Sequence, residues 1–227
     1  MILKDALDAL RIAFANFEQA ARSDDKTPLQ NALALSEAKE TFAATEDKPN
    51  IVVFADADRF KAINTAHGQP GGDAAINQIG ILIQEFFVKD CQAQAFRPSG
   101  DEFVILLHSK FLDTFKAATK SFAACQVQFD EKSFSVGVSF GYAVSDGNLE
   151  FEKVMSRAEA ACKKAKMEGS GTCLEWTEEI EQTVFKGLRE TCPDCGTIND
   201  CDVPQEMNLR ELNSCAACGT KFKPANP

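Results

Sequence analysis

The chain has 227 residues, of which 34 are Asp or Glu and 24 are Lys or Arg, so its formal net charge is −10. Hydrophobic residues make up 44% of the sequence and charged residues 26%, which is typical of a globular protein rather than a disordered or fibrous one. The acidic balance argues against a general DNA- or RNA-binding protein, because such a protein needs a basic surface to meet phosphates. It leaves room for a small anionic ligand in a locally basic site.

The sequence also argues against a membrane protein and an exported one. No stretch approaches the roughly 18 consecutive apolar residues that a membrane helix needs. Acidic residues interrupt the apolar positions at the N-terminus, unlike the apolar core of a signal peptide. We therefore expect a cytoplasmic protein that makes no contact with membranes.

Residues 1–22 are predicted to form one helix with an apolar seam. The apolar residues recur at alternating steps of four and three, as in a coiled coil: Leu3, Leu7, Leu10, Phe14 and Phe17. The run covers barely two and a half heptads, which is too short to be stable alone in water. Two interpretations stay open, a helix packed on its own domain and a dimerisation stalk over residues 1–23.

The rest of the chain alternates helical and extended patterns. The predicted helices cover residues 30–45, 59–66, 72–88, 110–124, 150–167 and 178–190. The predicted strands cover residues 51–55, 92–97, 103–108, 125–130, 133–144 and 172–176. Helices that alternate with strands, some of them joined by hairpins, predict the α+β class, here an α/β sandwich with a mixed central sheet.

Two acidic elements that lie far apart in the sequence are candidates for a metal site. Asp56 and Asp58 follow the apolar run at residues 51–55, and Asp101 and Glu102 lie in a predicted hairpin turn. Ligand sites in open α/β sheets lie at such strand ends. Carboxylates are the usual ligands of Mg²⁺, and paired metal ions promote nucleotidyl transfer. Solvated surface acids are the alternative, and the pattern alone does not decide between the two.

Short motifs surround these acids in a fixed order. Residues 56–64 have the sequence DADRFKAIN, and residues 97–103 have the sequence RPSGDEF. Gly72-Asp73, Ser139-Phe140-Gly141, Ala165-Lys166 and, more weakly, residues 27–31 add further matches. Together they resemble the GGDEF diguanylate cyclase family, whose pattern runs Asp-x-Asp-x-Phe-Lys-x-x-Asn, Gly-Asp and Arg-x-Gly-Gly-Asp/Glu-Glu-Phe. The resemblance implies a GGDEF domain with a palm-like nucleotide-cyclase fold over residues 24–176.

The resemblance also implies an activity, the condensation of two GTP molecules into cyclic di-GMP across a homodimer. Asp56, the backbone carbonyl of Ala57, and Asp101 would hold Mg²⁺ or Mn²⁺, with two ions per site. Asp101 would also help to deprotonate the attacking 3′-hydroxyl. Glu102 would supply a second acidic group in the same turn.

Other matching positions imply substrate contacts. Asn64 and Asp73 correspond to the guanine-reading residues, since an amide and a carboxylate can address the edge of guanine by hydrogen bonds. Lys61 and Lys166 correspond to phosphate contacts, although a solvated surface charge is the alternative for both. The implied substrate-binding set is completed by Phe60, Ser99 and Gly100.

Several positions depart from the family pattern. Ser99 replaces the first Gly of the signature, which would cost about 1 kcal/mol or more if a positive φ were required there. Ser170 stands where the family usually has an Arg that contacts the triphosphate. The family's inhibitory Arg-x-x-Asp pair becomes Asp90 and Ala93, so we expect no product inhibition through that site. Arg97 is interpreted as a structural residue that pairs with acids across the hairpin.

These departures keep an alternative function open. A catalytically weak or inactive GGDEF-type module would bind nucleotide and act on a protein partner through its C-terminal segment. A cyclase that makes a different cyclic dinucleotide is a third interpretation.

The C-terminal segment carries two Cys-x-x-Cys pairs. Cys192 and Cys195 are separated from Cys215 and Cys218 by the 19 residues 196–214, a spacing that predicts a Cys₄ zinc ribbon over residues 191–227. A module of this size needs a structural Zn²⁺ to fold. The remaining five cysteines are interpreted as spectators or small core residues: Cys91, Cys125, Cys162, Cys173 and Cys201.

The charge of this segment limits its partners. Residues 191–227 carry three bases and five acids, so their net charge is 3 − 5 = −2, which disfavours nucleic acid. A protein partner or a contact that stabilises the homodimer is expected instead. Residues 177–190 are predicted to link the ribbon to the preceding domain as a helix.

Overall fold

The computed structural model describes residues 2–42, 50–145, 147 and 149–181, and four short strands between residues 189 and 222. The chain divides into two compact units, Met1–Trp176 and Thr177–Pro227. Within the described part of the chain, no helix is long and apolar enough to cross a lipid bilayer.

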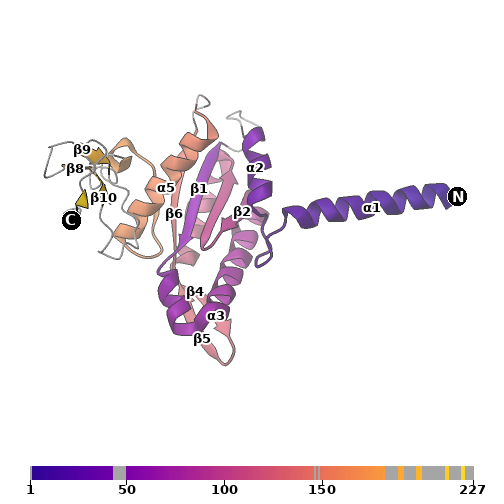
Figure 1. The fold of residues 1–227 in the computed structure, drawn as a ribbon, viewed down its shortest axis with the longest axis horizontal. Coiled ribbons are helices and arrows are strands. Elements are labelled where there is room, and N and C mark those ends of the chain that lie inside the picture. Colours follow the sequence, from indigo (N-terminus) through magenta and orange to yellow (C-terminus); the bar gives the residue numbers. More distant parts are fainter. Residues whose placement is uncertain are drawn as a thin grey trace. The chain divides into compact units, whose positions relative to one another are not determined.

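The first unit is built on a mixed five-stranded sheet (Figure 1). The strand order is β2-β3-β1-β6-β7, in which β7 pairs parallel to β6 and every other pairing is antiparallel. The five strands are β1 (Ile51–Ala57), β2 (Gln94–Ser99), β3 (Glu102–Leu107), β6 (Val138–Val144) and β7 (Cys173–Glu175). The predicted α+β class with a mixed sheet is confirmed.

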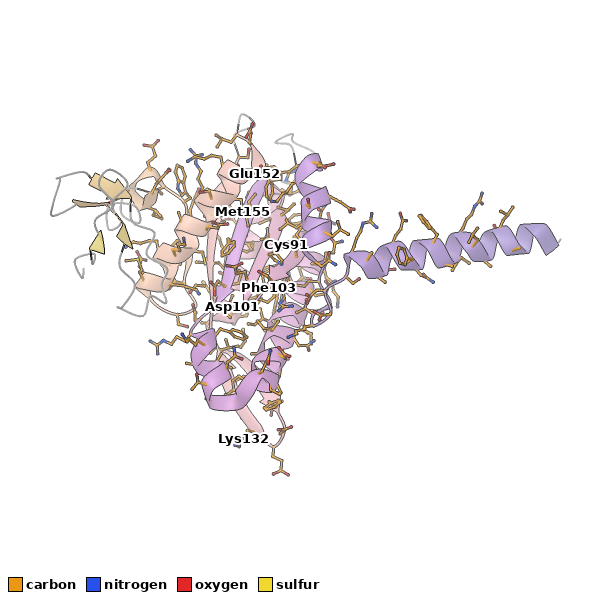
Figure 2. All side chains as sticks on the ribbon, viewed as in Figure 1. Cys91, Asp101, Phe103, Lys132, Glu152 and Met155 are labelled. Carbon is orange, nitrogen blue, oxygen red and sulfur yellow. The ribbon has the colours of Figure 1, made fainter. Side chains whose placement is uncertain are left out.

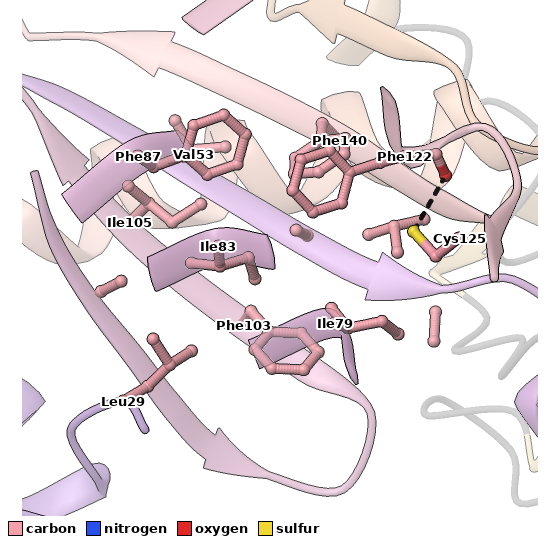
Figure 3. Close-up of a cluster of buried hydrophobic side chains, with 14 of the residues drawn as sticks. Leu29, Val53, Ile79, Ile83, Phe87, Phe103, Ile105, Phe122, Cys125 and Phe140 are labelled. Atoms are coloured by element: carbon pink, nitrogen blue, oxygen red, sulfur yellow. Dashed lines mark hydrogen bonds between the residues drawn. The ribbon is translucent and has the colours of Figure 1, made fainter. Parts of the chain in front are cut away.

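Helices cover both faces of this sheet, because alternate residues of β1 point into two different cores. Val53 packs with the apolar residues of α3 and with a group of aromatic rings that includes Phe87, Phe122 and Phe140 (Figure 3). Val52 packs in the second core, against α2 and α5. The helices concerned are α2 (Ala32–Thr41), α3 (Phe60–Ile83), α4 (Leu112–Thr119) and α5 (Phe151–Glu168).

The region predicted as two helices with a turn between them is one bent helix. Helix α3 runs across Gly68, whose φ of 72° and ψ of 174° are not helical, and continues as a π-helical segment, η1 (Gln84–Lys89). Pro70 lies just after the break, in the first turn of the second half, where its missing N–H leaves no helical bond unmade. The predicted break is therefore real, but it is confined to about one residue instead of forming a loop.

The single strand predicted over residues 133–144 is divided in two. Strands β4 (Cys125–Phe129) and β5 (Lys132–Val136) form a separate antiparallel hairpin, whereas β6 joins the main sheet. The division falls at Gly137, where a Cβ would lie 2.1 Å from the Ser170 hydroxyl and 2.8 Å from Oδ2 of Asp58. The predicted helix over residues 110–124 is α4 with a 3₁₀ turn at each end, Ser109–Phe111 and Lys120–Phe122.

The N-terminal helix α1 (Ile2–Arg22) forms as predicted and leaves its seam open. The side chains of Leu10, Phe14 and Phe17 are 66%, 61% and 69% exposed. At its end, Nε of Arg22 donates to Oε2 of Glu37 on α2 at 2.6 Å. This exposure contradicts the interpretation that the seam packs on its own domain.

The second unit contains two short antiparallel hairpins. Strand β8 (Arg189–Thr191) pairs with β9 (Ile198–Asp200), and β10 (Asn213–Ser214) pairs with β11 (Lys221–Phe222). The linker helix predicted to reach residue 190 is wrong at its end, because Arg189 already belongs to β8. The predicted zinc ligands and Cys201 lie outside the described residues: Cys192, Cys195, Cys215 and Cys218.

Candidate functional site

The antiparallel register of the sheet brings the two acidic elements together. Asp56, near the end of β1, lies opposite Glu102 at the start of β3. The backbone N–H of Ala57 donates to the carbonyl of Asp101 at 3.2 Å. Asp101 therefore lies in the β2–β3 turn beside the end of the central strand (Figure 2). Asp56 and the consecutive acids Asp101 and Glu102, which are far apart in the sequence, therefore share one edge of the sheet.

The charges at this edge are only partly compensated. Lys166 of α5 forms an ion pair with Oδ1 of Asp56. Burial nevertheless raises the pKa of Asp56 to about 6; Lys166 opposes the rise, and the charges of Asp101 and Glu102 add to it. Burial also raises the pKa of Glu102, with a further contribution from Asp101. Excess negative charge of this kind favours the binding of a cation.

The donor set fits a divalent cation such as Mg²⁺. Asp56, Asp101 and the carbonyl of Ala57 offer only hard oxygen ligands, and Mg²⁺ usually takes one or two protein carboxylates and completes its shell with water and phosphate. In the described part of the chain, no three His, Cys, Asp or Glu side chains already surround a metal position. Lys166 meets Asp56 at the point where a cation would bind, so the lysine supplies the positive charge in this structure.

Asp58 is not part of this unbalanced group. Its side chain is buried and accepts hydrogen bonds from the hydroxyls of Ser139 at 2.7 Å and Ser170 at 2.6 Å, and from the N–H of Gly171 at 2.8 Å. Asp58 thus ties the end of β1 to β6 and to the turn after α5. No local pattern predicts this role for Ser170, which lies 112 residues from Asp58.

The signature turn is held by Arg97. Its guanidinium donates to the carbonyl of Gly100 from Nε at 3.0 Å and from Nη2 at 2.8 Å, and Nη1 donates to Oδ2 of Asp24 at 2.9 Å. The structural interpretation of Arg97 is confirmed, although its acidic partner precedes α2 and does not lie across the hairpin. The left-handed residue is Gly100, with φ of 54°, whereas Ser99 is extended in β2. The conformational cost expected for Ser99 is therefore not incurred.

The two predicted guanine-reading residues lie on either side of the break in α3. Asn64 packs against Gly72 so closely that a Cβ there would lie 1.9 Å from Oδ1 of Asn64 and 3.1 Å from Cζ of Phe60. Oδ1 of Asn64 is buried and has no hydrogen-bond partner among the described residues. Asp73 follows Gly72 directly, and its Oδ1 lies 2.6 Å from Nζ of Lys26, a residue that the sequence reasoning missed.

The structure also locates the predicted phosphate contact Lys61 and the two positions of the family's inhibitory pair. Lys61 is exposed on the first turn of α3. At the positions of the family's inhibitory pair, Asp90 is exposed and Ala93 is buried beside the buried Cys91. No charged pair like that of the family can form at Asp90 and Ala93.

The sequence is similar to known proteins over most of the first unit. Residues 21–172 match the family described as "Diguanylate cyclase, GGDEF domain". Diguanylate cyclase DgcP of Pseudomonas aeruginosa is 32% identical over 159 residues, which is 66% of this chain and 23% of that protein. Cyclic di-GMP phosphodiesterase PdeR of Escherichia coli is 28% identical over 177 residues, 74% of this chain and 26% of that protein. The chain thus spans about a quarter of the length of these two curated relatives.

Solved structures are similar to the fold. The diguanylate cyclase SiaD of Pseudomonas aeruginosa, solved with its activator SiaC, has a TM-score of 0.63 at 20% identity, covering 77% of this chain and 69% of that chain. The coiled coil and GGDEF domain of DgcB of Caulobacter crescentus, solved with c-di-GMP, has a TM-score of 0.61 at 22% identity, covering 76% and 96%. At these identities the similarity shows the fold alone.

Proposed function

Because the chain belongs to the GGDEF domain family of diguanylate cyclases, we propose that it condenses two GTP molecules into cyclic di-GMP. The observation that carries the proposal is the meeting of Asp56, Asp101 and Glu102 at one edge of the sheet, where Lys166 compensates only part of the negative charge. An acidic edge of this kind suits a metal-assisted nucleotidyl transfer.

Asp56, Asp101 and the carbonyl of Ala57 would hold Mg²⁺, two ions per site in our proposal, and Mn²⁺ is an acceptable substitute. A bound divalent cation would neutralise charge on the triphosphate and on the leaving pyrophosphate. With the substrate present, Lys166 would exchange Asp56 for a phosphate oxygen, since an ammonium group serves either anion as a point charge.

The remaining roles are those that the family resemblance implies. Asp101 would accept the proton of the 3′-hydroxyl of one GTP as that hydroxyl oxygen attacks the α-phosphorus of the other GTP and pyrophosphate leaves, with Glu102 as the second acid of the turn. The same transfer in the opposite direction, with loss of a second pyrophosphate, would close the ring. Asn64 and Asp73 would accept hydrogen bonds from guanine beside Phe60. The phosphates would be bound by Ser99 and Gly100 at the signature turn and by Lys61 at the start of α3.

Each subunit would hold one GTP, so the reaction needs two catalytic domains face to face. The exposed seam of α1 supports a homodimer in which the helices of two subunits cover each other. Activity would then rise faster than linearly with enzyme concentration near the dissociation constant of the dimer. Product inhibition through the positions of Asp90 and Ala93 would be absent.

The test is to incubate the purified protein with Mg²⁺ and GTP, ATP or both, and to identify the products by mass spectrometry. We expect cyclic di-GMP from GTP alone. The variant Asp101→Asn should lose at least about a hundredfold of turnover, because it removes the proton acceptor and a metal ligand while keeping the side-chain shape. Circular dichroism and urea denaturation of both proteins are the control for folding. Unchanged product formation by Asp101→Asn would contradict the assignment of the catalytic residue.

The alternative function is a nucleotide-binding module without turnover that acts on a protein partner. One observation favours it: Lys166 and Lys26 already occupy carboxylates that the cyclase would need, those of Asp56 and Asp73. In the same incubation, GTP binding without any cyclic dinucleotide would support this alternative.

We also propose that the second unit holds a structural Zn²⁺ through the four thiolates of Cys192, Cys195, Cys215 and Cys218. Each Cys-x-x-Cys pair falls in sequence between two strands that pair with each other, one between β8 and β9 and the other between β10 and β11. Two paired strands on either side of each Cys-x-x-Cys sequence are a suitable frame for a tetrahedral Cys₄ site. The ribbon is our candidate for a docking surface for a protein partner.

A further inference from the structure

A lysine lies on the carboxylate that our proposed function assigns to guanine recognition. Nζ of Lys26 is 2.6 Å from Oδ1 of Asp73, and the two side chains are 33% and 44% exposed. The ion pair is thus open to solvent and within reach of an incoming nucleotide. While the ammonium group holds Oδ1 of Asp73, it occupies one acceptor position of this carboxylate and offsets the negative charge that would attract the donors of a base.

Hydrogen bonds on both sides hold the backbone of Lys26 in place. The N–H groups of Lys26 and Thr27 both donate to Oδ1 of Asp24, at 3.2 Å and 2.9 Å. The carbonyl of Lys26 accepts from Nδ2 of Asn77 at 2.7 Å, and Asn77 lies one helical turn after Asp73 on α3. The backbone of Lys26 is therefore held from both its N–H and its carbonyl, and its ammonium group reaches Oδ1 of Asp73 from this fixed position.

The same segment is packed against the helix and tied to the signature turn. A Cβ at Gly80 would lie 2.6 Å from Cβ of Thr27, so the segment lies against α3. Asp24, which organises the turn around Lys26, is also the carboxylate partner of Arg97, and Arg97 holds Gly100. The position of Lys26 is coupled in this way to the turn that carries Asp101.

The neighbouring residues present an unfilled acceptor. Oδ1 of Asn64 is buried without a hydrogen-bond partner among the described residues, and Asn64 packs on Gly72, next to Asp73. Buried acceptors of this kind are normally satisfied, so a ligand that brings hydrogen-bond donors would be bound here with little competition from the protein. Guanine brings two adjacent donors, N1–H and the 2-amino group, whereas adenine has no such pair.

We propose that Lys26 is a specificity-determining residue that competes with guanine for Asp73. The N1–H and 2-amino donors of guanine then compete with the ammonium group for the lone pairs of the Asp73 carboxylate, while Asn64 accepts a hydrogen bond without any such competition. This inference rests on the proposed role of Asn64 and Asp73 in reading guanine. Since partly exposed ion pairs are weak, removal of the lysine charge should tighten guanine nucleotide binding by about two- to fivefold.

The experiment compares the full-length protein with Lys26→Met, which keeps an unbranched side chain and removes the charge. Binding of GDP and ADP is measured by titration calorimetry with Mg²⁺, because neither nucleotide can be cyclised. We expect the Kd for GDP to fall by about two- to fivefold and the Kd for ADP to change less, because ADP cannot use both acceptors. The variant Lys26→Arg keeps a cation on Asp73 and should bind GDP like the unmodified protein.

A matched control removes a lysine charge from η1, the continuation of the helix that carries Asp73. Nζ of Lys89 lies 2.5 Å from Oε2 of Glu85 in η1, so Lys89→Met deletes one ion pair and one positive charge outside the predicted site. It should leave the Kd for GDP unchanged. An unchanged or raised Kd for GDP in Lys26→Met, or an equal gain in Lys89→Met, would overturn the inference.

The same proteins separate this inference from the proposed activity. If GDP binding tightens in Lys26→Met but no cyclic di-GMP forms from GTP, the proposed turnover is wrong and the role of Lys26 stands. If cyclic di-GMP forms and the KM for GTP is the same with and without Lys26, the role of Lys26 is wrong and the activity stands. If neither protein binds GDP, both are wrong.

Discussion

Asp56 and Asp58 lie two residues apart at the end of β1, yet their surroundings differ in kind. Asp58 is buried and accepts three hydrogen bonds, which compensate the loss of its hydration. Burial raises the pKa of Asp56 to about 6, the two neighbouring acids add to the rise, and the ion pair with Lys166 opposes it. We infer that Asp58 fastens the strand end and that Asp56 is the acid left available for a cation.

This division predicts different effects on stability. Asp58→Ala should lower the free energy of unfolding by about 3 kcal/mol or more, because it leaves three donors without their buried acceptor. Ser170→Ala should cost only about 1–2 kcal/mol, since two donors to Asp58 remain. Urea denaturation followed by circular dichroism measures both. If Asp58→Ala were no more damaging than Ser170→Ala, the anchoring role of Asp58 would be refuted.

At the scale of elements, α1 is a helix whose apolar seam is left uncovered by the described residues of the chain. Three of its large seam residues are each more than 60% exposed: Leu10, Phe14 and Phe17. A short isolated helix is only marginally stable in water, so we infer that the seam of a second copy packs against this one and stabilises both helices. The element is thereby connected to the proposed reaction, which needs two subunits.

We predict that Leu10→Asp combined with Phe14→Asp converts a dimer into a monomer in sedimentation velocity experiments. Charges in the seam would lose the apolar burial and repel each other across it. Turnover of GTP at low enzyme concentration should fall by about tenfold or more as the dimer dissociates. Ile12→Asp is the matched control, because Ile12 is 63% exposed but lies off the seam. Dimers that persist in the double variant would point to another dimerisation element.

Local sequence patterns predict most of the helices and strands but not all of their bounds. The acids, the strands that carry them and the break at Gly68 were all predicted, because each depends on hydrophobic periodicity or on turn residues. The extent of the break was not predicted, because Pro70 fits a first helical turn as well as it fits a loop. The division of residues 133–144 was missed because it falls at Gly137, where the side chains of Ser170 and Asp58 leave no room for a Cβ. Both of these residues are distant from Gly137 in the sequence.

At the scale of the whole molecule, contacts between residues that are distant in the sequence again separate the site residues that were predicted from those that were missed. Motif spacing brought out Asp56, Asp101 and Asn64, whose catalytic and binding roles remain predictions. Lys26 and Ser170 were not recognised as partners of Asp73 and Asp58, because these contacts join residues 47 and 112 positions apart. Contacts of that range depend on the register of the sheet and the path of α3, and a single sequence does not specify either in advance.

The cysteines give the last prediction, because the two units should treat their thiols differently. Four cysteines of the first unit are free, and three of them are buried. Burial raises the pKa of Cys125 and of Cys173 to about 11, and it also raises the pKa of Cys91 and Cys162. Few of these thiols are ionised near neutral pH, and since the thiolate is the nucleophile they should react slowly with iodoacetamide.

The proposed zinc ligands should be protected for a different reason, so a chelator should expose them selectively. We expect about one Zn²⁺ per chain by elemental analysis, and alkylation of Cys201 alone in the native protein. After zinc is removed, intact mass should show about four further alkylations, because metal-free thiolates are reactive and the ribbon loses its fold. Cys192→Ser should lower the zinc content without changing GDP binding. Protein without zinc, or one whose alkylation is unaffected by the chelator, would contradict the Cys₄ site.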